Sequence, residues 1–352
     1  MVAPKPVSSD EIKSKVNSLR FKLDNLRDDA SLKSSIDSYT SLESKISNFT
    51  IRVSTLRQRK YAYNNLLEKS AVDLGNRIAA QASSIQAQIS IQSTRLQNSL
   101  QAINLRLNAL GNYPALPMVT AIENELDGFE SQCDAAKNAV NSLFSGISSD
   151  ASQYDRDLRE IEYALDQVDL ASFQMLSGES VVRAVKAVWC KNGKEEKNDP
   201  EGVLYLTDQR LIFEQKEEIA TKKVLFVTTE KQKVQQFLFE VPVALIQEAS
   251  GEKQGVFKNV DMLKLTLASG AFSPNAVLHL FDQDCQEWQK TIVLVKTHEI
   301  DSLRVIPVDT TAQEKVKAAP TQCPNCGGLI NQPILRGQDT IKCEFCGATI
   351  RL

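Results

Sequence analysis

Hydrophobic residues recur at helical spacing through most of the first half of the chain. Three stretches, 10–56, 67–110 and 119–168, place apolar side chains three and four residues apart, and the third is the most regular. Because this spacing lines one face of an α-helix, residues 10–175 are expected to be almost entirely helical. Residues 1–9 carry no such pattern and are expected to form a disordered tail.

A short segment between the second and third stretches breaks the helical pattern. Residues 111–117 are Gly-Asn-Tyr-Pro-Ala-Leu-Pro, and a glycine with two prolines does not continue a helix. The stretches on either side are therefore predicted to fold back on each other as a long antiparallel α-helical coiled coil. The first stretch can complete a three-helix bundle in the same chain or exchange between subunits, and periodicity does not decide between these arrangements. A weaker break is expected at the Gly/Ser-rich residues 145–149.

The hydrophobic pattern changes in the second half of the chain. Short runs there are continuously apolar or alternate with polar residues, and charged turns separate them; this is typical of strands in a sandwich or an open barrel. The seven predicted strands are 181–189, 202–206, 210–213, 224–227, 236–241, 263–267 and 277–281. A helix is expected after them, capped by Asp282 or Asp284 and burying Trp288, Ile292 and Val295.

The formal net charge of the chain is −3, and basic and acidic residues nearly balance within each predicted domain. No predicted domain has the excess of Lys and Arg that non-specific phosphate binding needs, so nucleic acid is not an expected partner. Within the helical part, residues 1–106 hold 16 basic and 9 acidic side chains, whereas residues 107–175 hold 3 basic and 12 acidic ones. Opposite charge on neighbouring helices favours their packing and is compatible with self-association through the coil.

One part of the helical region is almost without charge. Between residues 78 and 105 the only charged side chain is Arg95, and the other polar positions are Gln, Ser, Thr and Asn. A solvated helix usually carries more charge. Two explanations remain open: a helix covered on more than one side, by the bundle or by another subunit, and an ordinary polar face.

Four of the seven cysteines form two matching pairs near the end of the sequence. The segments Cys323-Pro-Asn-Cys326-Gly and Cys343-Glu-Phe-Cys346-Gly share one pattern. Two intervening residues let a tight turn direct both sulfurs at one ion, and the glycine that follows supplies the positive φ of such a knuckle. Four thiolates complete a tetrahedron and leave no position open for water or substrate. One structural Zn²⁺ is therefore predicted to bind Cys323, Cys326, Cys343 and Cys346.

These two knuckles resemble the zinc-ribbon family, and the resemblance covers residues 322–352. It implies a small fold that needs its metal, because about 30 residues have too little core to fold alone. Between the pairs a hairpin is expected, with arms at 329–330 and 340–342 and a tip near 336–339. Residues 348–352 can add a closing strand.

The segment 201–214 joins two apolar strands through a polar turn at 207–210. Its sequence, Glu-Gly-Val-Leu-Tyr-Leu-Thr-Asp-Gln-Arg-Leu-Ile-Phe-Glu, resembles the strand-turn-strand of GRAM and bacterial pleckstrin-homology-like (PH-like) domains. With Gly178-Glu179 before it and the Trp288 helix after it, the resemblance covers 177–300. It implies a PH-like β-barrel with a C-terminal helix; another small β-barrel is the alternative.

Members of this superfold bind phosphoinositides or protein segments. The loop that often holds a lipid headgroup corresponds here to residues 191–199, in which three lysines are offset by Glu195, Glu196 and Asp199. The loop contains no arginine to form a two-pronged contact with phosphate. The resemblance therefore implies docking of a protein at least as much as binding of a lipid.

The remaining candidates for chemistry do not form a recognisable motif. Cys133 occupies a seam position of the third helical stretch and is expected to be a buried hydrophobic residue. Cys190 and Cys285 lie at a strand end and a helix start, and no sequence motif around them indicates a lowered thiol pKa. His279 is expected to face outward and His298 to lie near a helix end. No catalytic or cofactor-binding residue is predicted, and the expectation is a protein without enzymatic activity.

Together these patterns predict a multidomain α+β protein. Its expected parts are the coiled coil at 10–175, the PH-like domain at 177–300, a flexible linker at 301–321 and the zinc ribbon. The expected function is a scaffold or adaptor that assembles through the coil and docks protein partners through the other two modules. The alternative is a peripheral membrane protein that uses the coil and the PH-like domain on anionic lipid. A third hypothesis is an enzyme built on Cys190 or Cys285.

A cytoplasmic location is expected, with attachment at a membrane surface under the second hypothesis. The start of the sequence lacks the apolar segment of a secretory signal. Cysteines arranged as metal ligands, and not as a disulfide framework, are typical of a reducing compartment.

Overall fold

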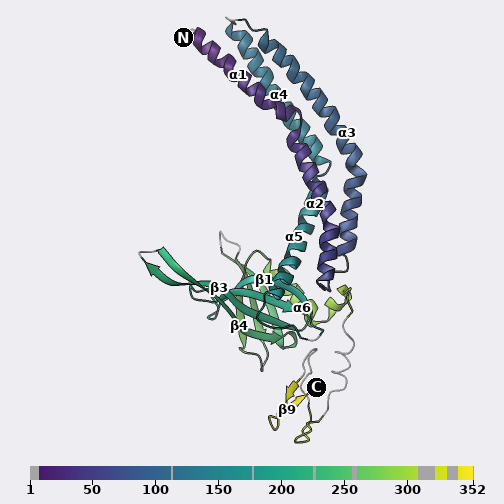
Figure 1. Ribbon diagram of the computed structural model, residues 1–352, viewed down its shortest axis with the longest axis vertical. Helices are drawn as coiled ribbons and strands as arrows, with labels where there is room; N and C mark the ends of the chain where they lie inside the picture. Colours follow the sequence, from purple (N-terminus) through teal and green to yellow (C-terminus); the bar gives the residue numbers. More distant parts are fainter. Residues whose placement is uncertain are drawn as a thin grey trace. The chain divides into compact units, whose positions relative to one another are not determined.

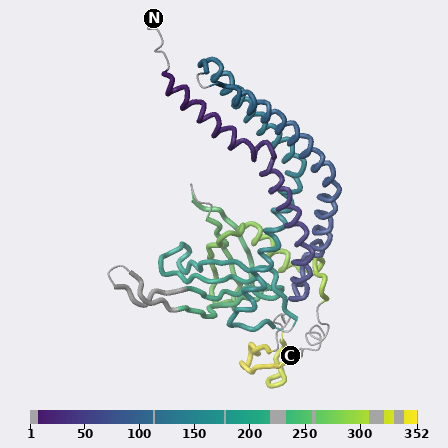
Figure 2. The backbone as a smooth tube through the Cα atoms, turned by 45° about the horizontal axis from the view of Figure 1, so that its top comes forward, coloured from purple at the N-terminus to yellow at the C-terminus, as the bar shows by residue number. Residues whose placement is uncertain are grey.

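The structure, a computed structural model, describes residues 8–111, 114–176, 178–224, 227–255, 260–307, 322–330 and 340–351. The chain divides into two compact units (Figure 1 and Figure 2). The first comprises Met1–Ile51 and Glu68–Asp155, and the second comprises Arg52–Leu67 and Arg156–Leu352. Most of the expected N-terminal tail lies outside the described residues.

Five helices occupy most of the described residues up to position 169. They are α1 (Ser9–Ala30), α2 (Lys33–Gln58), α3 (Leu67–Asn108), α4 (Leu116–Ser142) and α5 (Ser145–Asp169). The predicted break at 111–117 lies between α3 and α4, where Pro117 occupies the first turn of α4. A second break falls between α4 and α5 at Leu143 and Phe144, directly before the predicted weak point.

In the first unit, α1 and α4 lie side by side and run in the same direction. Lys15 pairs with Glu123 at 3.2 Å, and Lys22 pairs with Asp127 at 2.6 Å and with Glu130 at 2.8 Å. Basic residues of the first helical stretch therefore meet acidic residues of the third, as the asymmetry of charge between residues 1–106 and 107–175 predicts.

Helix α3 runs antiparallel to α4 and α5 in this unit. Arg77, near its start, pairs with Asp150 at 2.7 Å, and Arg106, near its end, pairs with Glu125. The three helical stretches thus form a bundle within one chain. Its core consists of the predicted apolar faces, and the fully buried side chains include Phe49, Ile85, Leu126, Phe129 and Cys133. Supercoiling of these helices as a coiled coil stays a prediction.

A seven-stranded antiparallel sheet dominates the second unit. Its strands lie in the order β4-β3-β2-β1-β7-β6-β5, so that β1 pairs with both β2 and β7. The strands are β1 (Val181–Trp189), β2 (Glu201–Thr207), β3 (Arg210–Val224), β4 (Val227–Pro242), β5 (Ile246–Gln254), β6 (Val260–Leu267) and β7 (Asn275–Leu280).

Helix α6 (Cys285–Lys296) packs on β5 and β6. It buries Trp288, Ile292 and Val295, as predicted. Of the two candidate caps, Asp284 is the one used, because its carboxylate accepts the backbone amide hydrogens of Gln286 and Glu287. None of the described helices is long and apolar enough to cross a membrane.

The predicted barrel is wrong in one respect, because the sheet is open. Its edge strands β4 and β5 do not pair with each other within the described residues. Helix α6 covers β5 instead, and the Gln289 side chain accepts the amide hydrogen of Gly251 at 2.8 Å. Aromatic rings join β4 to more distant parts of the sheet: the ring centroid of Phe239 on β4 lies 5.0 Å from that of Trp189 on β1 and 4.1 Å from that of Phe272, between β6 and β7.

The strands differ from the prediction at two places. Of the predicted strand 224–227, Val224 ends β3 and Val227 begins β4, which pair with each other, while residues 225 and 226 lie outside the described part of the chain. Strand β5 was not predicted, because only two of its side chains, Ile246 and Ala249, are buried. An edge strand with so little buried surface lacks the alternation of apolar and polar residues that marks other strands.

The residues that follow α6 pack within the second unit. The 3₁₀ turn η2 (Glu299–Leu303) follows the helix, and the Val305 amide donates to the Ala62 carbonyl at 2.8 Å. The first residues of the expected linker, 301–321, therefore contact the segment between α2 and α3. Residues 308–321 lie outside the described part of the chain.

Candidate functional site

The two cysteine pairs fold into knuckles of the same shape. In the first, the amide of Gly327 donates to the Cys323 carbonyl at 2.8 Å; in the second, the amide of Gly347 donates to the Cys343 carbonyl at 2.8 Å. The φ angles of Gly327 and Gly347 are +73° and +71°. Only glycine adopts this region without strain, so both glycines have the conformation that the sequence pattern predicts.

The knuckles bring the four thiols of Cys323, Cys326, Cys343 and Cys346 together. All four sulfur atoms lie within 4.8 Å of one another. Across the knuckles, Cys323 Sγ lies 3.7 Å from Cys346 Sγ, and Cys326 Sγ lies 3.6 Å from Cys343 Sγ. A tetrahedron with Zn–S bonds of about 2.3 Å has edges of about 3.8 Å. The donor set and its spacing therefore fit one tetrahedral Zn²⁺.

Backbone amides add to the electrostatics of this cysteine cluster. A hydrogen bond from the Ala348 amide, together with the neighbouring Cys326 thiol, lowers the pKa of Cys346 to about 6. The Asn325 side chain also donates to Cys346 Sγ, at 3.8 Å. Donors directed at sulfur stabilise the thiolate, which is the form that binds metal.

The fold around the cluster is small. The strand β8 (Thr340–Lys342) pairs with β9 (Thr349–Arg351), which is the predicted closing strand. Ile341, Ile350 and the two cysteines Cys323 and Cys343 form a buried core, against which Ile330 packs. The predicted hairpin tip at 336–339 lies outside the described residues.

Among the described residues of this small fold, two large apolar side chains remain on the surface. Leu329 is 57% exposed and Phe345 is 69% exposed. Phe345 belongs to the second knuckle, and its ring lies over Gly328 of the first, where a Cβ would come within 2.6 Å of it. The knuckle geometry therefore presents an aromatic ring to solvent beside the cysteine cluster.

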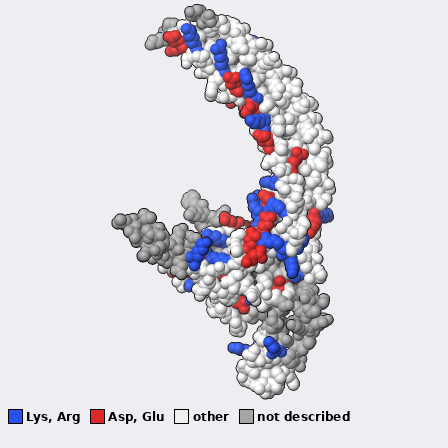
Figure 3. Space-filling model, viewed as in Figure 1, with Lys and Arg blue, Asp and Glu red and all other residues white. Residues whose placement is uncertain are grey.

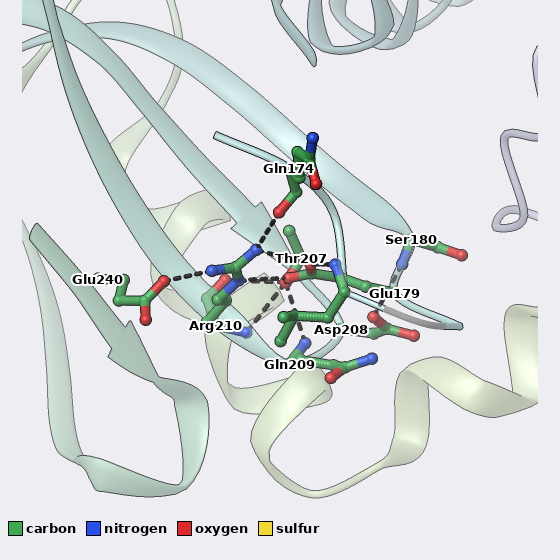
Figure 4. A network of polar contacts seen from close by, with 9 residues as sticks. Gln174, Glu179, Ser180, Thr207, Asp208, Gln209, Arg210 and Glu240 are labelled. Carbon is green, nitrogen blue, oxygen red and sulfur yellow. Dashed lines mark hydrogen bonds and ion pairs between the residues drawn. The ribbon is translucent and has the colours of Figure 1, made fainter. Parts of the chain in front are cut away.

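The polar turn of the PH-like segment, Thr207–Arg210, lies in a buried network (Figure 4). The Arg210 guanidinium donates to both carboxylate oxygens of Glu179, at 2.9 and 3.0 Å, and it also contacts Glu240. A third contact runs to the Gln174 carbonyl at 2.7 Å. The Glu179 side chain is fully buried and that of Arg210 is 9% exposed. Glu179 and Arg210 therefore stabilise the hairpin and are buried away from any ligand.

The next residue of the same turn, Asp208, contacts the segment after α6. Its carboxylate accepts the Ser180 amide hydrogen at 3.0 Å and pairs with Arg304 at 2.7 Å. Arg304 also donates to the Tyr63 hydroxyl at 2.6 Å. Arg304 was not predicted as a structural residue, since it lies in the expected linker and no local pattern marks it.

Another buried carboxylate, that of Glu214, lies at the end of the PH-like segment. It accepts hydrogen bonds from the Ser172 amide at 2.7 Å and the Gln235 side chain at 2.9 Å, and it pairs with Lys216 at 3.0 Å. Burial by itself raises the pKa of Glu214, but these hydrogen bonds outweigh burial and lower the pKa below its ordinary value. The carboxylate therefore stays charged inside the unit.

The loop at 191–199, the candidate site for a lipid headgroup, uses its acidic groups internally. Asp199 accepts the backbone amide hydrogens of Lys191 at 3.4 Å and Glu196 at 2.8 Å. The Glu195 carboxylate lies 2.6 Å from Nδ1 of His279. The His279 side chain, expected to face outward, therefore faces this loop and is only partly exposed to solvent. The carboxylates that balance the lysines are thus fixed in place, and the loop has no net charge to offer a phosphate.

A polar cavity of about 610 Å³ opens between the end of α5 and the sheet. It is lined by Tyr163 and by Lys186, Lys216 and Lys233, among others. Lys186 pairs with Glu201 at 2.7 Å, and Lys216 pairs with Glu214 as described above. Because two of the three ammonium groups have carboxylate partners, the cavity lacks the concentrated positive charge that would select an anion.

The three cysteines outside the knuckles are buried. Desolvation raises the pKa of Cys133, Cys190 and Cys285 to about 11 in each case. Cys285 lies near Asp261 and Asp284 in an arrangement with metal-like spacing. There the Lys253 ammonium lies 2.9 Å from Asp284 and 3.7 Å from Asp261, and Asp284 already caps α6. This group is accounted for as a helix cap with its counter-ion.

The sequence matches no protein-family model and no curated protein sequence. Among solved structures, the chain is similar to the Vps36 N-terminal PH domain, with 10% identity over 36% of this chain and 95% of that one, at a TM-score of 0.24. A DUF1696-family protein with a pleckstrin-homology domain from Shewanella loihica covers 39% of this chain and 92% of its own, with 17% identity and a TM-score of 0.22.

The DH/PH domains of p115-RhoGEF match a longer part of the chain. They cover 72% of this chain and 66% of their own, with 13% identity and a TM-score of 0.20. TM-scores this far below 0.5 do not establish a shared fold. Membership of the zinc-ribbon and GRAM families therefore stays a prediction from the residues quoted above.

Proposed function

We propose that this chain is a non-enzymatic adaptor. A zinc ribbon at 322–352 and a PH-like sheet module at 177–300 dock protein partners, and the helical bundle serves assembly. The observation that carries the proposal is the convergence of four thiols at the spacing of a tetrahedral zinc site. A metal held by four protein ligands has no open position for a reacting group, so its role is to hold the ribbon in shape.

The exposed side chains of the ribbon are the proposed docking residues. Leu329 and Phe345 are large and apolar, and they lie on a unit whose own buried core is very small. Exposed aromatic residues beside a rigid frame are typical centres of protein interfaces. The zinc supplies that rigidity, because without it the two knuckles have no common partner.

Protein docking is also the better-supported role for the PH-like module. The loop at 191–199 carries equal numbers of acidic and basic residues, and its carboxylates bind its own backbone and His279. The conspicuous Thr207–Arg210 turn is engaged inside the unit. These features favour a neutral contact surface over a site for an anionic headgroup.

Affinity capture from a cell lysate tests the proposal. The bait is the intact tagged chain, compared with Phe345→Ser and with a Cys343→Ser/Cys346→Ser double variant. Phe21→Ser is the matched control, because Phe21 of α1 is 70% exposed and Phe345 is 69% exposed. We expect at least one protein to be retained by the parent and the control and lost by both ribbon variants. Identical captured proteins in all four samples would contradict the proposal.

Vesicle sedimentation separates the proposal from the membrane hypothesis. The intact chain is mixed with neutral vesicles and with vesicles containing anionic lipid, at low and high salt. We expect it to stay in the supernatant with both. Pelleting that requires anionic lipid and is lost at high salt would favour a peripheral membrane protein.

A further inference from the structure

The outward face of α3 differs from the rest of the first unit. Over most of α3 the exposed positions carry Gln, Ser, Thr, Asn and Ala, and between residues 78 and 105 Arg95 is the only charged residue. The ion pairs that join α3 to α5 and α4, Arg77 with Asp150 and Arg106 with Glu125, lie near the two ends of α3. Figure 3 shows a largely uncharged surface along the upper part of α3.

Large apolar side chains are exposed on the same face. Ile91 is 61% exposed and Leu105 is 63% exposed. Their neighbours along the face repeat at steps of four and three residues, which is the spacing of a coiled-coil seam. The eight exposed seam positions are Ala80, Ser84, Ala87, Ile91, Thr94, Asn98, Gln101 and Leu105.

The side chains of the seam match in size those of a second, antiparallel copy of the same seam. If two copies of α3 align antiparallel about a twofold axis between Gln92 and Ser93, each seam residue meets one whose number adds with its own to 185. The resulting pairs are Ala80 with Leu105, Ser84 with Gln101, Ala87 with Asn98, and Ile91 with Thr94. Each pair joins a smaller with a larger side chain, as close packing between helices requires.

We propose that two copies of this chain associate through the exposed seam of α3, with the two α3 helices antiparallel. The occupant is a second copy because the face has almost no charge with which to select a charged partner, while its alternation of sizes matches itself. The surface beside the seam carries little charge: a groove of about 240 Å³ is lined by Gln92 and Arg95 of α3 and by Gln132, Ala135 and Ala139 of α4, and Arg95 is the one charged residue in its described lining. This inference specifies the assembly role proposed for the bundle and is independent of docking through the ribbon.

The charges near the seam are compatible with this register. Arg95 of one copy lies opposite Ser90 of the other, and Arg77 lies opposite Asn108, so like charges do not meet. A guanidinium at position 91 would instead lie beside the second copy's Arg95 in a buried contact. Ile91→Arg is therefore the most disruptive single substitution that the register predicts.

Sedimentation velocity over a range of concentrations measures the association. We expect the parent to show a concentration-dependent monomer–dimer equilibrium and Ile91→Arg to raise the dimer dissociation constant by roughly tenfold or more. Ile51→Arg is the matched control, because Ile51 in α2 is 65% exposed and lies outside the seam. Its dissociation constant is expected to stay within about twofold of the parent value, and far-UV circular dichroism checks that both variants are helical.

Cross-linking tests the antiparallel register directly. Positions 80 and 105 are ~37 Å apart along one helix, yet they adjoin each other across the proposed interface. Oxidation of a mixture of the single variants Ala80→Cys and Leu105→Cys is expected to link residue 80 of one copy to residue 105 of the other, as mass spectrometry of the joined peptides would show. Neither variant alone is expected to link 80 to 80 or 105 to 105.

Three results would overturn the inference. One is a parent chain that sediments as a monomer at every concentration. Another is a dimer that Ile91→Arg leaves intact or that Ile51→Arg weakens equally. The third is a link between like positions, which would require parallel helices. None of these results bears on capture of partners by the ribbon, so failure of this inference and failure of the adaptor proposal remain distinguishable.

Discussion

Arg210 shows how one buried side chain holds several parts of the second unit. It joins the β2–β3 turn to Glu179 before β1, to Glu240 on β4 and to the backbone after α5. The charge is buried only because its partners are fixed around it. Removing the guanidinium leaves the Glu179 carboxylate buried without its main counter-ion.

Arg210→Ala is therefore expected to lower the free energy of unfolding of this unit by about 3–5 kcal/mol. Urea denaturation followed by tryptophan fluorescence measures it, because both tryptophans, Trp189 and Trp288, lie in this unit. Lys186→Ala is the control: it breaks an exposed pair with Glu201 and should cost less than about 1 kcal/mol. Equal effects of the two substitutions would show that the buried network is not the stronger contact.

The thiols provide a second prediction for individual residues. A pKa of about 11 for Cys190 and Cys285 leaves roughly one thiol in ten thousand ionised at pH 7. Iodoacetamide is therefore expected to leave both cysteines unlabelled in the folded protein and to label them after unfolding in guanidinium, as mass spectrometry would show. Labelling of either one in the folded protein faster than a free cysteine would revive the hypothesis of a cysteine enzyme.

At the level of elements, Gly202 explains why a glycine occurs within β2. A Cβ built on it would lie 2.0 Å from the Glu214 carbonyl oxygen on the paired strand β3. The carbonyl oxygen is a backbone atom and a Cβ is bonded directly to the backbone, so neither can rotate away. Strands β2 and β3 must therefore separate to admit a side chain at position 202. The glycine of the PH-like segment is thus a consequence of close strand approach.

Gly202→Ala is expected to lower the free energy of unfolding of the sheet unit by about 1–3 kcal/mol, because overpacking displaces a paired strand. Tryptophan fluorescence in urea is again the measurement. Gly128→Ala is the contrasting variant, since Gly128 is exposed within α4 and no atom lies within 4 Å of its would-be Cβ. It should stabilise the helical unit by about 0.5–1 kcal/mol, measured by far-UV circular dichroism in urea because that unit contains no tryptophan. A Gly202→Ala variant as stable as the parent would refute the steric explanation.

Elements with strong local patterns were predictable from the sequence. The helices, the α6 cap and the positive φ of Gly327 and Gly347 follow from spacing and from residue type within a few positions. Strand β5 was missed because its exposed side chains give it no apolar alternation. The strand pattern allows a sandwich or an open barrel and does not decide that the sheet stays open, because the covering of β5 by α6 depends on packing between distant segments.

The same distinction applies to the sites. Four cysteines in two identical knuckles carry their geometry locally, so their convergence could be expected. The partners of the Thr207–Arg210 turn lie far away in sequence: Glu179 is 31 residues from Arg210, and Arg304 is 96 residues from Asp208. A single sequence contains no pattern that pairs such residues, so from the sequence alone the turn indicates a family resemblance and not its buried contacts.

For the whole molecule, the account depends on the metal. If zinc holds the ribbon together, the chain carries a rigid docking element in addition to the bundle and the sheet, and the adaptor proposal follows from exposed groups on that element. If the four thiols bind no metal, residues 322–352 lack enough buried surface to present Leu329 and Phe345 in a fixed arrangement.

Elemental analysis of the purified intact chain is the most direct test of this claim. The account predicts one zinc per chain after dialysis, and loss of that zinc in a Cys343→Ser/Cys346→Ser double variant, while Phe345→Ser retains it. A chain that binds no stoichiometric zinc, or one whose zinc content is unchanged when Cys343 and Cys346 are replaced, would contradict it.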